Sequence, residues 1–387
     1  MAHTVLLGLV YLSFISIGLP DGMLGVAWPV MRLQMDQPLA AVGAITMTMT
    51  ACSAASSLLA GGLVQRIGTG AVVAGSCLLT ALGILGFSVA PSFAWLVALA
   101  VPLGLGAGAV DASLNHFVSA HYSSRHMNWL HGFWGVGATT GPLVMGVALA
   151  SEGGWAAGAS TIGLMQLALA LLLWATVSLW SRETAQPQPV DDQPDAAPVA
   201  PAAPPAVALW LAPLCFLFYV SAEMGTGLWA ASILVNDRGL PAADAGLWVS
   251  LYFGSITAGR FAVGLVAERL GNRRLVRMGV MLAMAGAVLF ALPDVFGPVS
   301  RLGLVLMGLG CAPIFPSLMH ETARRFPPEA VRALIGRQMT CAYVGSSVVP
   351  AAFGLLATWA GLGAVMPVVV LLLVVLLLVT RRLDQLS

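Results

Sequence analysis

The stretch VGLVAERLGNR, residues 263–273, decides the fold, because a related stretch, GGLVQRIGTG, occurs at residues 61–70. In each copy an Arg-x-Gly element, at Arg66 and Arg269, joins two long apolar runs. Two more pairs of stretches follow the same spacing of about 203 residues: GLPDGMLGVAW (18–28) with VSAEMGTGLWA (220–230), and GLGAGAVDASLNH (104–116) with GLGCAPIFPSLMH (308–320). Matches in one order at one spacing indicate that the chain consists of two related halves.

The composition is that of a membrane protein. Hydrophobic residues make up 59% of the 387 residues and charged residues only 9%, whereas a soluble domain has about 25% charged residues. A helix needs about 20 apolar residues to cross a bilayer. Twelve such runs are expected, at residues 5–31, 39–65, 70–90, 93–118, 129–150, 156–180, 208–235, 243–267, 275–293, 299–320, 332–358 and 361–380. The sequence therefore predicts an all-α polytopic membrane protein with six helices in each half.

The two halves are separated by ETAQPQPVDDQPDAAPVAPAAPP, residues 183–205, which contains seven prolines and four acidic residues. Such a composition cannot bury enough apolar surface to fold. The predicted domains are an N-terminal bundle over residues 1–181, a disordered linker over 182–207 and a C-terminal bundle over 208–387.

Arginine placement predicts the orientation, since short cytoplasmic loops carry an excess of basic residues. With the amino terminus inside the cell, thirteen arginines fall in cytoplasmic segments and only Arg32, Arg238 and Arg301 fall outside. Both termini and the linker are therefore expected in the cytoplasm, and the location is expected to be a bacterial-type inner membrane.

Twelve helices in two parallel halves, joined by a cytoplasmic linker, resemble the major facilitator superfamily. The stretch GLVAERLGNRR, residues 264–274, resembles that family's loop motif Gly-x-x-x-Asp/Glu-Arg-x-Gly-x-Arg-Arg, whereas the first half has Gln65 at the acidic position. The resemblance implies two bundles related by pseudo-two-fold symmetry. It also implies a cytoplasmic gate made of Gly264, Glu268, Arg269, Gly271, Arg273 and Arg274.

Only four charged side chains lie well within the predicted spans: Asp21, Asp111, Glu223 and Arg260. A charge at the middle of a bilayer costs about 2.5–3.5 kcal/mol, so such groups are by default functional. Burial favours the neutral form of a carboxylic acid. A carboxylate that alternates between a wet cavity and a closed one can therefore carry a proton without any cofactor, and we expect proton coupling at the three acids.

Each of these groups also has a structural interpretation. Asp111 and Asn115 are four residues apart on one helix face, and they either line a polar cavity or form a hydrogen bond to a neighbouring helix. Asp21 either borders the cavity or caps backbone amides freed near Pro20. Glu223 is the repeat counterpart of Asp21, and it is either a second proton site or the ion partner of Arg260. Arg260 in turn either pairs with an acid or binds an anionic substrate.

A closer resemblance concerns GLGAGAVDASLNHFV (104–118) and MNWLHGFWGVGATTGP (127–142), which look like the fourth and fifth helices of the fucose:proton symporter family. Acids on the first and fourth helices carry coupling and sugar recognition there, and Asp21 and Asp111 fall on those positions. His131 and Trp134 stand at two positions that face the sugar. The expected substrate site therefore comprises Asp21, Asp111, Asn115, His131, Trp134, Glu223 and Arg260.

The predicted function is secondary active transport of a small polar solute, a sugar or sugar-like compound, by alternating access. Proton symport is implied by the resemblance. The alternative is a proton-coupled antiporter that exports a drug or metabolite, because 17 methionines suit adaptable binding of apolar cargo. A membrane-embedded enzyme is a remote alternative, since the sequence lacks the nucleophile and metal motifs that such chemistry needs.

The expected partners follow from the same features. They are the solute, protons and the lipid bilayer. A net charge of +1 points to no nucleic-acid partner. No catalytic residue, cofactor or metal site is expected, and the chain is expected to be a monomer.

Overall fold

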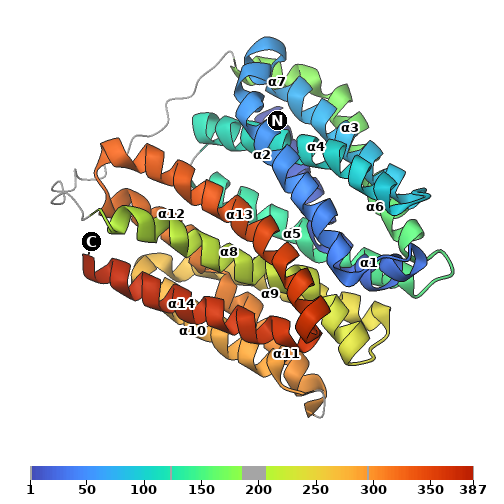
Figure 1. Cartoon of the computed structure of the whole chain (residues 1–387). Helices are drawn as coiled ribbons and strands as arrows, with labels where there is room; N and C mark the ends of the chain where they lie inside the picture. Colours follow the sequence, from blue (N-terminus) through green and yellow to red (C-terminus); the bar gives the residue numbers. More distant parts are fainter. Residues whose placement is uncertain (1, 123, 185–205, 294–295, 387) are drawn as a thin grey trace. The chain divides into compact units, whose positions relative to one another are not determined.

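The computed structural model describes residues 2–122, 124–184, 206–293 and 296–386, apart from the side chains at 2, 3, 124, 125, 128, 181–184, 266–268, 328 and 332. The predicted linker lies almost wholly in residues 185–205, outside the described residues. The described chain is helical and contains no strand. The first helices are α1 (Ala2–Gln34), α2 (Val42–Ile67), α3 (Thr69–Ser88), α4 (Phe93–His121), α5 (Ser124–Leu149), α6 (Gly154–Ala175) and α7 (Val177–Thr184) (Figure 1).

The second half begins with α8 (Ala208–Ser232), which continues as the π-helical turn η2 (Ile233–Asp237). The helices that follow are α9 (Ala242–Leu270), α10 (Asn272–Ala291), α11 (Pro298–Cys311), α12 (Ile314–Arg325), α13 (Pro328–Ala360) and α14 (Val365–Leu386). Eleven helical stretches of the described residues are long and apolar enough to cross a membrane. With α9, a helix of 29 residues, they account for the twelve predicted spans.

The chain divides into two compact units. One, the N-terminal unit, takes in α1 to α7 together with Leu240–Ser250. The other, the C-terminal unit, takes in α8, η2 and the chain from Leu251 onward. The first turns of α9 thus group with the N-terminal unit, and the rest of that helix groups with the C-terminal unit.

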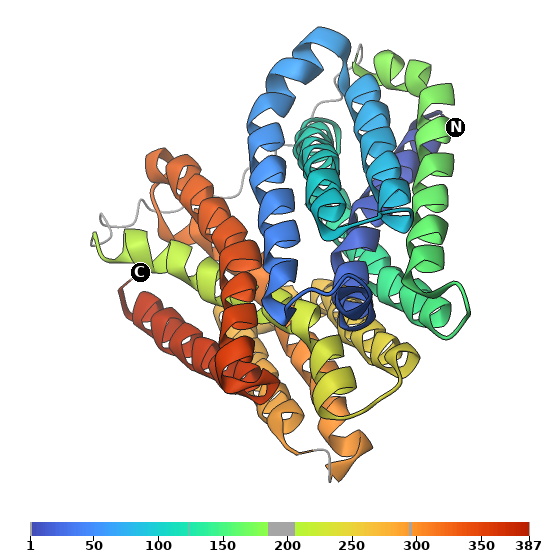
Figure 2. The same ribbon diagram turned by 45° about the vertical axis from the view of Figure 1, so that its right-hand side comes forward.

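The two units repeat one arrangement of helices. In the N-terminal unit α1 packs on α5, and α3 packs on α4 and α6; in the C-terminal unit α8 packs on α13, and α10 packs on α11 and α14 (Figure 2). The Arg-x-Gly loops also match, because Gly68 and Gly271 adopt positive φ angles of 84° and 76°, a conformation that glycine adopts at little cost. The duplication seen in the sequence is therefore a duplication of structure.

One predicted span differs from its repeat counterpart. The run at 299–320 forms two helices, α11 and α12, which meet at Ala312 and Pro313. The aligned position in the continuous helix α4 is Ala109. The break thus falls at a proline, which lacks the N–H that would continue the helix, although α1 and α4 contain Pro20 and Pro102 without a break.

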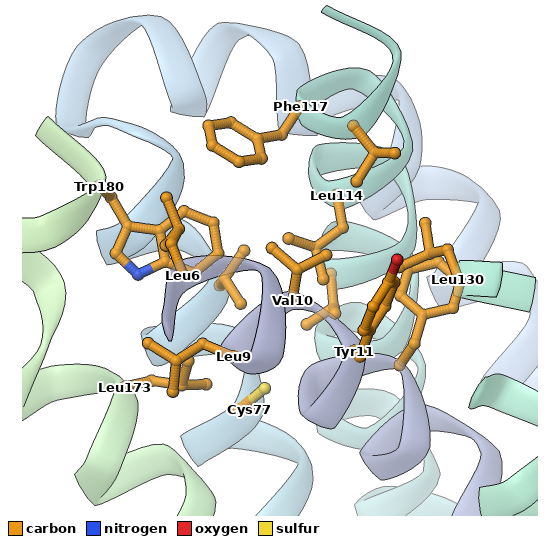
Figure 3. Packing of buried hydrophobic residues seen from close by; sticks show 14 of the residues in the cluster. Leu6, Leu9, Val10, Tyr11, Cys77, Leu114, Phe117, Leu130, Leu173 and Trp180 are labelled. Atoms are coloured by element: carbon orange, nitrogen blue, oxygen red, sulfur yellow. The ribbon is translucent and has the colours of Figure 1, made fainter. Parts of the chain in front are cut away.

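A cluster of buried side chains packs six helices of the N-terminal unit together, namely α1 and α3 to α7 (Figure 3). Its members include Leu6, Val10, Cys77, Leu114, Phe117, Leu173 and Trp180. Because lipid tails are as apolar as these side chains, close packing and not exclusion from water favours association of helices in a bilayer. This packing fixes the positions of α1 and α4, which carry three of the predicted site residues, Asp21, Asp111 and Asn115.

Glycines bring α1 and α5 into close contact. A side chain at Gly18 would meet the carbonyl oxygen of Trp134, and side chains at Gly137 and Gly141 would meet the carbonyl oxygens of Ile15 and Leu19. Small residues at such crossings allow two backbones to approach closely. The approach determines which side chains of α5 can reach α1.

Candidate functional site

Asp21 and Trp134 form the centre of the site in the N-terminal unit. The indole Nε1 of Trp134, on α5, donates a hydrogen bond of 2.9 Å to the Asp21 Oδ2 on α1. Asp21 is exposed on the surface of this unit, whereas Pro20 and Gly22 on either side are buried. The close approach of α1 and α5 therefore presents an oriented carboxylate with an aromatic ring beside it.

Asp111 and Asn115 form a second polar pair on α4. The Asn115 Nδ2 donates to both the backbone oxygen and the Oδ1 of Asp111, each at 2.9 Å. The two glycines of the same helix face, Gly104 and Gly108, lie against backbone carbonyls of α2. Among the described residues, the Asp111 carboxylate makes its hydrogen bond within its own helix, with no bond to a neighbouring helix.

Each of the two carboxylates accepts a hydrogen bond from a neutral donor, Asp21 from the indole of Trp134 and Asp111 from the amide of Asn115. The ion pairs found among the described residues all lie in the C-terminal unit. In the described part of the N-terminal unit, Asp21 and Asp111 therefore have no arginine partner. Nearby on α5, one turn before Trp134, half-buried His131 packs edge-on against Phe14 with ring centres 5.7 Å apart.

Glu223 and Arg260 are brought together in the C-terminal unit. Arg260 Nη2 lies 3.3 Å from the Glu223 Oε1, and the two side chains are only 16% and 3% exposed. The buried hydroxyl of Tyr252 donates to the Glu223 backbone oxygen at 2.9 Å, and the buried hydroxyl of Tyr219 donates to the Cys311 backbone oxygen at 3.2 Å. Glu223 is thus in contact with Arg260, and its role as a second proton site stays a prediction.

The repeat-related acids therefore stand in different surroundings. Asp21 is an exposed carboxylate whose hydrogen-bond partner is a neutral indole. Glu223 is buried, and the charge of Arg260 balances its own. The position aligned with Asp111 is Phe315, so the second acid of the N-terminal unit has no counterpart in the C-terminal unit.

The loop motif at 264–274 joins an ionic network at one end of the C-terminal unit. Arg273 Nε donates to the Glu321 Oε2 at 2.9 Å, and the buried Arg325 contacts both Glu321 at 3.2 Å and Asp384 at 2.5 Å. A fourth contact joins Arg277 to Asp384 at 3.3 Å. These pairs connect α10, α12 and α14.

Among the described side chains, the other predicted gate residues form none of these contacts. Gly264, Arg269 and Arg274 are exposed, and the side chain of Glu268 lies outside the described residues. Gly271 supplies the positive φ at which α10 begins.

Several partners in these sites could not be assigned from the sequence. Tyr252 lies in an apolar run, and nothing in its spacing predicts its hydrogen bond to the backbone oxygen of Glu223. Trp134 was expected to face the solute, but its hydrogen bond to Asp21 was not expected. Gln166 could have been singled out from the sequence, because it is a lone amide within the apolar helix α6.

A duplicated bundle of apolar helices with charged groups inside its spans defines a polytopic membrane transporter. The sequence matches the Major Facilitator Superfamily over residues 10–350, and the chain belongs to that family. An uncharacterized MFS-type transporter of Yersinia pestis is 25% identical over 158 residues, which cover 41% of this chain and 40% of that protein. The match thus spans less than half the length of that relative.

Solved structures agree with the fold at low sequence identity. The nucleoside transporter NupG superimposes with a TM-score of 0.75 at 14% identity, covering 97% of this chain and 98% of that chain. A bacterial homologue of the human lysosomal transporter Spinster, in an inward-facing state, gives 0.76 at 14% identity over 99% and 97%. The peptide transporter POT gives 0.75 at 14% identity over 98% and 95%. These likenesses concern the fold.

Proposed function

We propose that this transporter moves a small polar solute, a sugar or sugar-like compound, together with protons by alternating access. The observation that carries the proposal is that two carboxylates, Asp21 on α1 and Asp111 on α4, lie within spans of a unit where neither has an arginine partner among the described residues. Burial within a membrane span favours the neutral form of a carboxylic acid. An acid that takes up a proton in one arrangement of the helices and releases it in another can therefore couple proton movement to transport.

The same groups suit a solute rich in hydroxyls. The carboxylate oxygens of Asp21 and Asp111 and the amide oxygen of Asn115 are hydrogen-bond acceptors, which match the O–H donors of a polyhydroxy compound. The indole of Trp134, held by its bond to Asp21, offers a flat apolar face beside them. His131 lies one turn away on the same helix, and we propose that it also faces the solute.

We infer a fixed-charge role for Glu223 and Arg260. Their mutual contact and their burial support a pair that keeps the C-terminal unit neutral. We propose that the pair contributes polar groups to solute binding when the transporter changes state, and that Asp21 and Asp111 carry the proton.

The competing function is proton-coupled export of a drug or metabolite. The names of the structural neighbours do not favour one cargo, because they include a nucleoside and a peptide transporter. A sugar-like cargo therefore rests on the resemblance of helices α4 and α5 to the fucose:proton symporters. Cytoplasmic termini, an inner-membrane location and a monomeric state belong to the same proposal.

The experiment begins with a thermal-shift screen of the purified protein against hexoses, organic acids and amphiphilic drugs, since a bound ligand stabilises the folded form by mass action. The hexose that binds is then followed in proteoliposomes by uptake driven by a pH gradient and by counterflow. Wild type should accumulate it, and Asp111→Asn should abolish accumulation but retain counterflow, because exchange needs no net proton movement. Stabilisation by drugs alone, or proton-driven expulsion, would establish the exporter instead.

A further inference from the structure

Pro20 leaves a gap in the backbone hydrogen bonding of α1, one residue before Asp21. In an α-helix the N–H of each residue donates to the carbonyl oxygen four residues earlier, and proline has no N–H to donate. The helix runs without interruption from Ala2 to Gln34. The carbonyl oxygen of Ser16 therefore lacks its helical donor.

A side chain from another helix supplies the missing donor. The Nε2 of Gln166, on α6, donates to the Ser16 carbonyl oxygen at 2.5 Å, across 150 residues of sequence. Gln166 is 1% exposed and Ser16 is 2% exposed, so no solvent competes for the bond. It lies in a polar seam of Ser13, Ser16, Cys77, Thr80 and Gln166, between α1, α3 and α6.

The side-chain amide of Gln166 has a cost in stability at this buried position, and that cost indicates which of its two polar atoms is useful. The Oε1 of Gln166 is buried and accepts no hydrogen bond from the described residues. A buried acceptor left unsatisfied is destabilising, whereas leucine or methionine would fill a similar volume without that penalty. The benefit of glutamine at this position is therefore its N–H donor, directed at Ser16.

The internal repeat provides a natural comparison. The residue aligned with Pro20 is Ala222, which can make the ordinary helical bond. Spacings of 202, 203 and 204 residues all align Gln166 with a valine, at Val368, Val369 or Val370. At these aligned positions the N-terminal unit has both the proline and the amide, and the C-terminal unit has neither. This is expected if the amide compensates for the proline.

We propose that Gln166 is a positioning residue for Asp21. Its amide closes the gap that Pro20 opens in α1, and it thereby sets the direction in which the next residue presents its carboxylate to Trp134. A side-chain bond in place of a backbone bond leaves α1 able to bend between Ser16 and Pro20, since proline is a usual origin of helix bending. The inference rests on the proposed function in one respect, namely that Asp21 takes up the proton.

The first test is a double-mutant cycle on the full-length protein. Gln166→Leu should lower the apparent Tm by about 2–4 °C, because it leaves the Ser16 carbonyl without a donor. In a Pro20→Ala background the helix supplies its own donor, and the same change should cost less than half as much. Thr80→Val is the matched control, since the buried hydroxyl of Thr80 bonds only within its own helix, and its effect should be the same in both backgrounds. Equal losses for Gln166→Leu in both backgrounds would overturn the proposed compensation.

The second test reads the position of Asp21 directly. Protein labelled with 5-fluorotryptophan gives a 19F resonance for Trp134, which Trp134→Phe identifies, and protonation of Asp21 should move it. Gln166→Leu should shift the pH midpoint of that movement, whereas Thr80→Val should not. A residue with only a structural role would lower Tm and leave the midpoint unchanged, and that result would overturn the positioning role.

Failure of the proposed proton uptake by Asp21 can be distinguished from failure of the proposed compensation of Pro20 by Gln166. If Asp21→Asn leaves the pH response of Trp134 as it is in wild type, the response belongs to another group such as Asp111. Proton uptake by Asp21, and with it the proposed function, is then wrong. The double-mutant cycle needs neither a substrate nor a proton, so it decides the link between Gln166 and Pro20 separately.

Discussion

Replacing Arg260 by alanine tests how much stability the C-terminal unit draws from its buried ion pair. The change leaves the Glu223 carboxylate, 3% exposed, without its cation in a medium of low dielectric constant. Removing one partner of a buried pair costs about 3–5 kcal/mol. At about 2–4 °C per kcal/mol, the apparent Tm should fall by on the order of 10 °C.

Two matched variants make the result specific. Arg260→Ala combined with Glu223→Gln should recover a large part of the loss, because no uncompensated charge then remains. Arg277→Ala breaks an ion pair whose arginine is 48% exposed, and surface pairs of this kind contribute about 0–1 kcal/mol. Thermal unfolding in detergent, followed by circular dichroism, measures all four proteins.

Lowering the pH should also restore part of the stability of Arg260→Ala, because a protonated Glu223 carries no charge. In that variant the folded state binds a proton more readily than the unfolded state, so stability rises as pH falls. The reasoning is refuted if the double variant is no more stable than Arg260→Ala, or if Arg260→Ala costs no more than Arg277→Ala.

Three further predictions concern the other parts of the molecule. Asp21→Asn should abolish pH-driven accumulation and also weaken solute binding in thermal-shift titrations, and full binding by this variant would limit Asp21 to coupling. Gly137→Ala should lower the Tm, because the added methyl group meets the carbonyl oxygen of Ile15. Gly75→Ala, whose methyl group would have nothing within 4 Å, should raise the Tm slightly, because alanine in a helix is more stable than glycine by up to about 1 kcal/mol. Cysteines introduced at 183–205 should react with an impermeant maleimide only from the cytoplasmic side, and labelling of intact cells would reverse the orientation.

The sequence by itself determined the number and order of the spans, the duplication and the four charges within the spans. These properties can be read locally, because each membrane span must satisfy its own backbone hydrogen bonds and be apolar along its length. The matching stretches around Arg66 and Arg269 revealed the repeat, because a short loop between two spans is contiguous in the sequence and its motif can be recognised there.

Only the tertiary structure decided which polar groups meet. The sequence left the partner of Glu223 open, and the structure brings its carboxylate into contact with Arg260. It gave no indication that Trp134 donates to Asp21 or that Gln166 donates to Ser16. A helix that is apolar on all sides has no periodic pattern to show which face points to which neighbour. Those contacts depend on how the helices are rotated and how closely their glycines let them approach, and both are properties of the packed bundle.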